Sequence, residues 1–412
     1  MDWDARAREI LRENDRGGYT VPTAGLYPYQ WNWDSVFAAL GFAAFDAPRA
    51  WEEIETLFAA QWPDGMVPHI VFRVDEPSYF PGPSVWGAEQ GAWPSSGISQ
   101  PPVAATAIRA MADSAPERAA ALVPKLETWH RWWHRARDPQ GLGVIGIVHP
   151  WESGRDNLPD WDAPGAAIDV SGVGDYTRRD TALVDADMRP KKADYDRYLA
   201  LVQYGRERGW DQEAIAREGP FLVADVGITC ILLRAERDLL ALTERFGGDA
   251  AAVAARIAQM EAGLERLWSA DAGGYCSLDM RTGRLAKVAT AAAFLAFYAG
   301  VTTRRAGLLR LLEGFAEGAE YLVPSYDPRA RMFDHVRYWR GPVWAVVNYM
   351  IGRGLAECGE TAWAERVRRD TARLIRGAGF AEYFSPVDGQ DCGGGTFSWT
   401  AAVWLAWGLA GV

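Results

Sequence analysis

The chain has few cysteines, and their spacing is unsuited to metal binding. Four occur among 412 residues, and no two of them form a Cys-x-x-Cys pair; they are Cys230, Cys276, Cys358 and Cys392. Zinc knuckles and small disulfide-stapled folds require closely spaced cysteines. The sequence therefore predicts neither, and scattered small thiols are typical of a reducing compartment.

An excess of positive charge and long apolar runs are also missing. Lysine and arginine total 43 against 54 aspartates and glutamates, which gives a net charge of −11. Such a chain repels phosphate backbones, so we expect no nucleic-acid partner. No uncharged stretch is long enough for a membrane span, and residues 1–6 carry acids where a signal peptide is basic. We expect a cytoplasmic protein without a membrane partner, and a homo-oligomer stays open.

Helical periodicity dominates the rest of the sequence, which no linker-like stretch interrupts, so we expect one domain, 1–412. Leu122, Leu126, Trp129 and Trp133 share one helix face, and residues 253–264 repeat this pattern. Six other segments are apolar or small on nearly all sides: 33–45, 99–111, 225–233, 288–298, 341–351 and 397–409. Half-exposed helices alternating with fully covered ones predict two concentric rings, an all-α (α/α)6 barrel.

One interval between the covered segments is much longer than the others. It lies between 99–111 and 225–233 and contains residues 139–224. Long insertions in compact domains commonly form lids or binding loops. We interpret 139–224 as an insertion that forms part of the active-site rim, with residues 185–195 above the barrel mouth.

Two carboxylate-bearing segments suggest acid–base chemistry. Residues 151–157 read Trp-Glu-Ser-Gly-Arg-Asp-Asn, where glycine permits a sharp turn that gathers carboxylates, a guanidinium and an aromatic ring. A carboxyl group in such surroundings can have its pKa raised enough to donate a proton near neutral pH. Glycosidic bond cleavage needs a second carboxylate, and the best candidate is Glu382, shortly before the glycine-rich stretch 393–399.

Aromatic clusters lead into three of the covered segments, at 29–34, 338–344 and 396–399. Loops that enter the inner ring of such a barrel share one rim. Tryptophan and tyrosine offer flat faces to sugar C–H groups, and aspartate and glutamine bind pairs of hydroxyls. The rim is therefore typical of a sugar pocket.

These motifs resemble glycoside hydrolase family 63, most closely its bacterial mannosylglycerate and glucosylglycerate hydrolases. Seven of them occur in order across nearly the whole chain, which makes the resemblance specific. They are GGYTVP at 17–22, YQWNWD at 29–34, QWPDGMVPH at 61–69, SQPP at 99–102, WESGRDN at 151–157, YWRGPVW at 338–344 and FSWT at 397–400.

The resemblance implies inverting hydrolysis of 2-O-α-mannosyl- or glucosyl-D-glycerate to hexose and glycerate. Asp156 is then the general acid and Glu382 the general base, and we expect no metal or cofactor. By position in the family pattern, three residues hold the substrate carboxylate: Arg189, Tyr195 and Tyr338. Five further residues are expected to bind substrate: Tyr27, Trp31, Asp34, Gln100 and Trp339.

Other interpretations stay open at this point. The substrate could instead be a neutral α-gluco-oligosaccharide or another α-glucoside, and the barrel could belong to a histidine-dependent sugar epimerase or a non-catalytic sugar-binding protein. Asp34 could be a helix cap. His69 and His335 are interpreted as structural polar groups.

Overall fold

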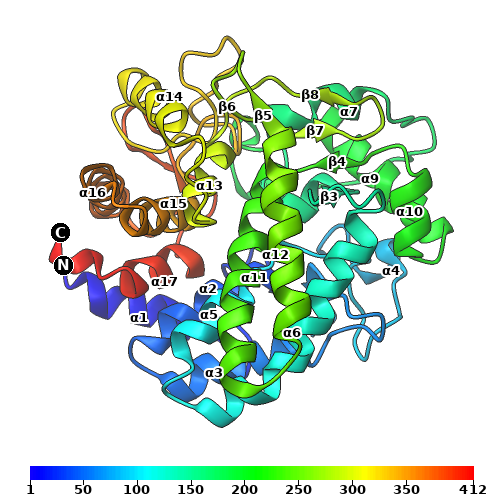
Figure 1. Ribbon diagram of the computed structural model, residues 1–412, viewed down its shortest axis with the longest axis horizontal. Coiled ribbons are helices and arrows are strands. Elements are labelled where there is room, and N and C mark those ends of the chain that lie inside the picture. Colours follow the sequence, from blue (N-terminus) through cyan, green and yellow to red (C-terminus); the bar gives the residue numbers. More distant parts are fainter.

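Six inner helices form a closed ring in the computed structural model, which describes residues 1–412. Each packs against the next, from α2 through α5, α11, α13 and α15 to α17, which returns to α2 (Figure 1). Their bounds are α2 (Asn32–Ala43), α5 (Ala104–Met111), α11 (Val226–Phe246), α13 (Leu295–Tyr298), α15 (Ala345–Glu357) and α17 (Ser398–Ala406).

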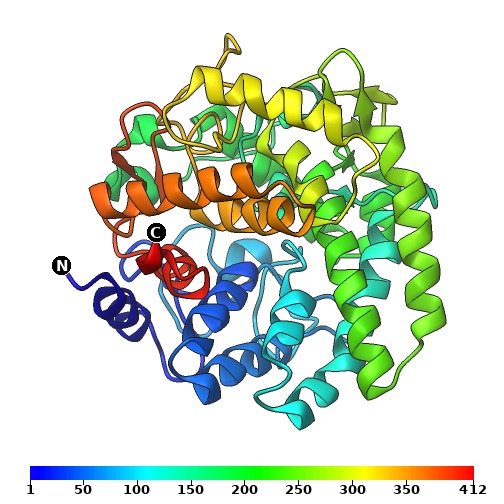
Figure 2. The same ribbon diagram turned by 60° about the vertical axis from the view of Figure 1, so that its left-hand side comes forward.

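Six outer helices cover this ring. α3, α6, α12 and α16 each pack on the inner helix beside them in sequence, and α1 closes the barrel against α17, which brings the two chain ends together (Figure 2). α14 packs on the 3₁₀ turn η5 (Ala291–Phe294) that leads into α13. The outer helices are α1 (Trp3–Glu13), α3 (Ala47–Phe58), α6 (Pro116–Arg137), α12 (Ala250–Leu264), α14 (Arg305–Gly318) and α16 (Thr361–Ala378). The predicted (α/α)6 barrel is confirmed.

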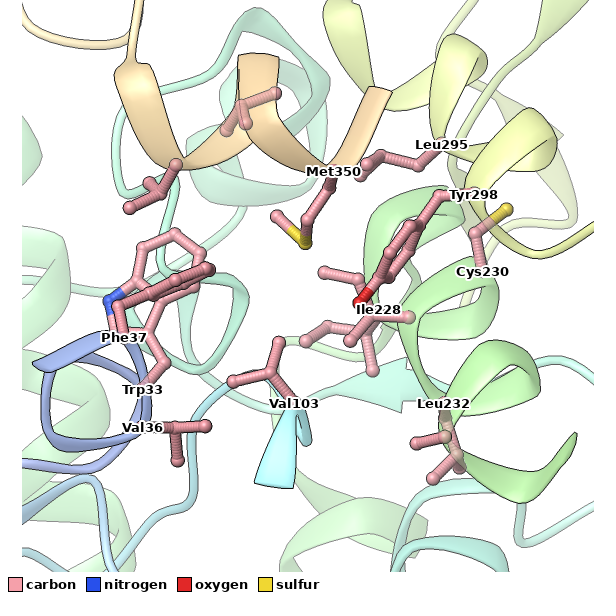
Figure 3. Packing of buried hydrophobic residues seen from close by; sticks show 14 of the residues in the cluster. Trp33, Val36, Phe37, Val103, Ile228, Cys230, Leu232, Leu295, Tyr298 and Met350 are labelled. Atoms are coloured by element: carbon pink, nitrogen blue, oxygen red, sulfur yellow. The ribbon is translucent and has the colours of Figure 1, made fainter. Parts of the chain in front are cut away.

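Burial explains why the two rings have different sequence patterns. α2 is buried on nearly all sides, whereas α16 buries a single stripe that includes Val367, Leu374 and Ile375. Side chains of several inner helices face one another in the middle of the ring, among them Phe37, Ile228, Tyr298 and Met350 (Figure 3). The amphipathic segments predicted at 122–133 and 253–264 lie in α6 and α12.

Proline displaces two of the predicted helix starts. The segment predicted from 99 becomes helical only at Ala104, because Pro101 and Pro102 precede it, and the one predicted from 341 begins at Ala345 after Pro342. The segment 288–298 contains four residues of 3₁₀ turn, Ala291–Phe294, followed by four residues of α-helix, Leu295–Tyr298. These are corrections of boundaries, not of the number of inner helices.

Residues near the two ends of the stretch 139–224 pair with each other. Gly146 of β3 (Gly146–Ile147) pairs antiparallel with Ala224 of β4 (Val223–Ala224). Between them lie η1 (Pro150–Ser153), η2 (Pro159–Trp161), α7 (Asp162–Ala166), α8 (Asp180–Leu183), η3 (Ala186–Met188), α9 (Lys192–Glu207) and α10 (Gln212–Glu218). That this stretch is an insertion, and that the chain is one domain, stay predictions.

The remaining elements are short. α4 (Pro83–Trp86) packs near α9, and η4 (Glu265–Leu267) and η6 (Leu409–Gly411) end two helical segments. The other strands are β1 (Gln30–Trp31), β2 (Ile70–Val71), β5 (Trp268–Ser269), β6 (Gly274–Tyr275), β7 (Leu278–Asp279), β8 (Arg284–Leu285), β9 (Tyr383–Phe384) and β10 (Asp391–Cys392). None of the helices combines the length and apolar composition needed to cross a bilayer.

Candidate active site

One cavity lies on the barrel rim, where the inner helices begin. It encloses about 870 Å³ of space, including the open space at its mouth. Its wall is formed by loops and first turns at α2, α5, α15 and α17, together with parts of residues 139–224. Nine of the residues predicted from sequence line it: Tyr27, Trp31, Asp34, Gln100, Asp156, Arg189, Tyr195, Tyr338 and Glu382.

Trp339 is the exception among the predicted substrate-binding residues. Its indole is buried and stacks face to face on Trp344, with ring centroids 3.7 Å apart. Its backbone N–H donates to the Asn157 side chain at 2.9 Å. Trp339 is therefore not among the residues that line the cavity, and a direct sugar contact stays a prediction.

The turn at residues 151–157 places one acid in the cavity and the other below it. Gly154 has φ of +66°, and a Cβ there would lie 2.7 Å from the Trp33 ring, so both conformation and space require glycine. Glu152 points away and binds Arg137 at 2.7 Å. Asp156 therefore remains as the acid that faces the cavity.

Asp156 is suited to hold a proton near neutral pH. Burial raises its pKa to about 7; Arg189 opposes this rise, and the charge of Glu382 adds to it. The Tyr338 hydroxyl interacts with the same carboxyl group and also favours ionisation. Because desolvation is the largest of these effects, Asp156 is substantially protonated at neutral pH.

Glu382 has the opposite surroundings. It is 1% exposed, and its carboxylate accepts hydrogen bonds from Tyr27 at 3.0 Å, from Arg189 at 3.1 Å and from the backbone N–H of Gly394 at 3.0 Å. A Cβ at Gly393 would come within 2.3 Å of Oε2, so glycine is needed for the carboxylate to fit. Three donors therefore converge on this one carboxylate.

Arg189 is the cation of the cavity and is almost fully buried. Besides Glu382, its guanidinium donates to Asp180 at 3.1 Å and to the Tyr27 hydroxyl at 2.5 Å. It also lies over the Tyr338 ring, 4.4 Å from the centroid. Asp180 binds Arg178 as well, so the two arginines share one carboxylate.

The two predicted tyrosines lie against different arginines. Tyr195, on α9, lies under the Arg178 guanidinium at 4.2 Å and against Trp151. Tyr338 has φ of +45°, which is uncommon for a tyrosine and directs its ring toward Arg189. Burial raises the pKa of both phenols, so both hydroxyls remain donors at neutral pH.

Other parts of the cavity lining are a buried acid, an amide and aromatic side chains. Burial holds the pKa of Asp34 well above its usual range, and the charges of Glu382 and Asp156 add to the shift. The Gln100 carbonyl accepts from the Trp33 backbone N–H at 3.3 Å. Asp34 lies inside the first turn of α2, whose N-cap is Trp31, so the capping interpretation is wrong.

His69, Arg179 and Asp180 are among the cavity residues that the sequence analysis did not assign to the site. Burial lowers the pKa of His69 well below its usual range, so its imidazole is neutral, and it lies beside Trp151. The motif at 61–69 could have indicated it. Asp180 and Arg179 have no comparable signal, because charged residues in a long loop usually face solvent. The other histidines do not line the cavity.

Known proteins are similar to this chain along most of its length. The family model described as "Mannosylglycerate hydrolase MGH1-like glycoside hydrolase domain" matches residues 27–400. The chain belongs to this glycoside hydrolase family. Mannosylglycerate hydrolase of Thermus thermophilus is 47% identical over 98% of this chain and 99% of its own length. Glucosylglycerate hydrolase of Mycolicibacterium hassiacum is 35% identical over 98% of this chain and 97% of its own length.

A solved structure agrees with the fold. The family 63 mannosylglycerate hydrolase of Thermus thermophilus, in complex with Tris and D-glycerate, superposes with a TM-score of 0.95 at 46% identity, covering 98% of this chain and 100% of that one. The resemblance to family 63 is thereby confirmed, and the chain is a glycoside hydrolase.

Proposed function

We propose that this protein is an inverting α-glycosidase that hydrolyses 2-O-α-mannosyl- or 2-O-α-glucosyl-D-glycerate to hexose and D-glycerate. The observation that carries the proposal is the pair formed by Asp156 and Glu382. Both line one cavity, one with its pKa raised to about 7 and the other held by three donors. Relatives with both substrate names, and the inverting chemistry of family 63, support it.

In the proposed reaction, Asp156 gives its proton to the oxygen that bridges the sugar and glycerate. The bond between this oxygen and the anomeric carbon breaks as a water molecule attacks from the opposite face. Glu382 takes a proton from that water. The products are a β-hexose and D-glycerate, and Asp156 recovers its proton from solvent.

Substrate recognition is assigned to two sides of the cavity. Arg189, Tyr195 and Tyr338 would hold the glycerate carboxylate through charge-assisted and hydroxyl hydrogen bonds. Tyr27, Trp31, Asp34 and Gln100 would contact the sugar, with Asp34 acting as a neutral donor and acceptor. We keep the cytoplasm as the proposed location.

The test is incubation of the purified protein with mannosylglycerate, glucosylglycerate and maltose, followed by assay of free hexose. We expect release from at least one glycosylglycerate and little from maltose, and the first hexose seen by proton NMR should be the β-anomer. Faster release from maltose would favour the neutral α-glucoside alternative. Release of the α-anomer would contradict inversion.

A further inference from the structure

Every acceptor site on the Glu382 carboxylate is occupied. Oε1 accepts from the Tyr27 hydroxyl at 3.0 Å and from Arg189 Nη1 at 3.3 Å. Oε2 accepts from Arg189 Nη1 at 3.1 Å and from the Gly394 N–H at 3.0 Å. A carboxylate offers about four lone-pair sites. In this arrangement Glu382 has no acceptor left for the proton of an attacking water.

Arg189 is the partner best placed to leave. The Gly394 N–H belongs to the backbone, and the Gly394 carbonyl accepts from the Glu382 N–H at 2.7 Å, so this contact is fixed from both sides. The Tyr27 hydroxyl is itself held by Arg189 Nη2. Arg189 comes from residues 139–224, outside the ring of inner helices, and its Nε is anchored separately on Asp180. Its two Nη groups can therefore change partners while Nε stays in place.

We propose that the carboxylate of the substrate takes the place of Glu382 on Arg189, so that binding of the aglycone frees the catalytic base. This inference rests on the proposed function, because it needs an anionic aglycone. Asp180 is then a positioning residue: it holds the Nε edge of the guanidinium while the Nη edge passes from one carboxylate to the other.

The charges explain why only an anion would make this exchange. Arg189 is 4% exposed and Glu382 1% exposed, so each needs a partner of opposite charge or strong hydrogen bonds. An incoming carboxylate leaves Arg189 paired before and after the exchange, and Glu382 keeps Tyr27 and Gly394 while it gains the water. A neutral aglycone would offer the two buried Nη groups no carboxylate in exchange for Glu382, although Nε would stay on Asp180. Preference for glycerate would then act on the chemical step as well as on binding.

The test uses a substrate without glycerate and adds D-glycerate as a separate molecule. In α-mannosyl fluoride and α-glucosyl fluoride the leaving group is one atom, so added D-glycerate can occupy the aglycone side during turnover. We expect D-glycerate to raise kcat of the wild-type enzyme on the fluoride of the accepted sugar on the order of tenfold. Glycerol, which has the same carbon chain without the charge, should give no increase.

Matched variants locate the effect. Arg189→Ala should lose the activation by D-glycerate, whatever its own rate without glycerate. Lys192→Ala removes another cation of residues 139–224 that is 75% exposed and paired with Asp196, and it should keep the activation. Asp180→Asn should weaken the activation more than it changes KM for the fluoride, because it loosens the anchor of Arg189.

Two outcomes would overturn the inference: D-glycerate acting only as a competitive inhibitor of fluoride hydrolysis, or glycerol activating as well as D-glycerate. Failure of the proposed function looks different. A protein that releases hexose from neither mannosylglycerate nor glucosylglycerate contradicts the proposed function itself. A protein that hydrolyses one of them, but whose fluoride hydrolysis is not activated by D-glycerate, contradicts only the exchange at Arg189.

Discussion

Two glutamate–arginine pairs lie close to the same motif and look alike in burial. Glu152 and Arg137 are both fully buried and 2.7 Å apart, and Glu382 and Arg189 are nearly as buried and 3.1 Å apart. They differ in what surrounds them. The first pair lies below the turn at 151–157, outside the cavity, and the second forms part of the cavity wall.

The remaining contacts show the consequence of that difference. Glu152 also accepts from the backbone N–H groups of Val148 and Ser99, and Arg137 from α6 also binds Gln212. These bonds tie the turn to the barrel. In the second pair, Glu382 also accepts from Tyr27, and Arg189 also binds Asp180. Tyr27 and Asp180 both line the cavity. Burial and ion pairing alone therefore do not distinguish a catalytic carboxylate from a structural one.

Removal of the cavity carboxylate, Glu382, should have the largest effect on activity. Glu382→Ala should lower kcat on the accepted glycosylglycerate about 10²- to 10⁴-fold, because no group then takes the proton of the attacking water. Steady-state hexose release measures the effect, and circular dichroism checks that the variant is folded. Activity within tenfold of wild type would show that Glu382 is not the base.

Removal of the structural carboxylate should have a different signature. Glu152→Ala leaves the Arg137 guanidinium buried without its partner, and we expect a loss of about 3–5 kcal/mol in the free energy of unfolding. Urea denaturation measures it. Asp187→Ala serves as the control, since its side chain is 85% exposed, and it should change stability by less than about 0.5 kcal/mol. Equal stability of the Glu152→Ala and Asp187→Ala variants would rule out the structural role.

The cation of the cavity pair distinguishes anionic from neutral substrates. Arg189→Ala should lower kcat/KM for the glycosylglycerate on the order of 10²-fold, because a buried carboxylate loses its charged partner. The loss on the glycosyl fluoride should be much smaller. Lys192→Ala is the matched control. Equal losses on both substrates would remove the assigned role of Arg189 in holding the aglycone.

The proton on Asp156 should make the activity depend on pH. Since its pKa is raised to about 7 by burial, kcat/KM for the glycosylglycerate should fall about tenfold per unit as pH rises above that value. Fluoride departs with less help from an acid, so the decline should be shallower for the glycosyl fluoride. Identical declines for the two substrates would argue against Asp156 as the acid.

The Asp156 proton should also affect the stability of the folded protein. The folded protein binds the Asp156 proton more tightly than the unfolded chain, whose value is 3.8. The resulting stabilisation is complete below pH 3.8 and is lost as pH rises through about 7. Asp156→Asn removes that loss, so the free energy of unfolding of the variant relative to wild type should rise by about 2–3 kcal/mol between pH 5 and pH 8, measured by urea denaturation at both pH values. A variant that is less stable than wild type at pH 8 would contradict a buried Asp156 carboxyl group with a raised pKa.

Much of the fold could be predicted from local patterns, because burial on all sides and burial on one side leave different periodicities. Helix starts after Pro102 and Pro342 were placed too early, since an apolar pattern continues through residues that cannot be helical. The positions of Asp156 and Glu382 on one cavity agree with the sequence hypothesis, and their catalytic roles stay predictions. Of the neighbours Tyr338 and Trp339, only Tyr338 lines the cavity, because adjacent residues point in different directions.

The sequence by itself determined the alternation of inner and outer helices and the glycines that the sharp turns require. It also supplied the motifs that mark a family 63 hydrolase. Only the tertiary structure decided which acid of the turn at 151–157 faces the cavity, and that Arg189 binds Glu382 across 193 positions of the chain. Helix periodicity is a property of neighbouring residues. Electrostatic pairing depends on distances and burial that exist only after remote segments have packed together.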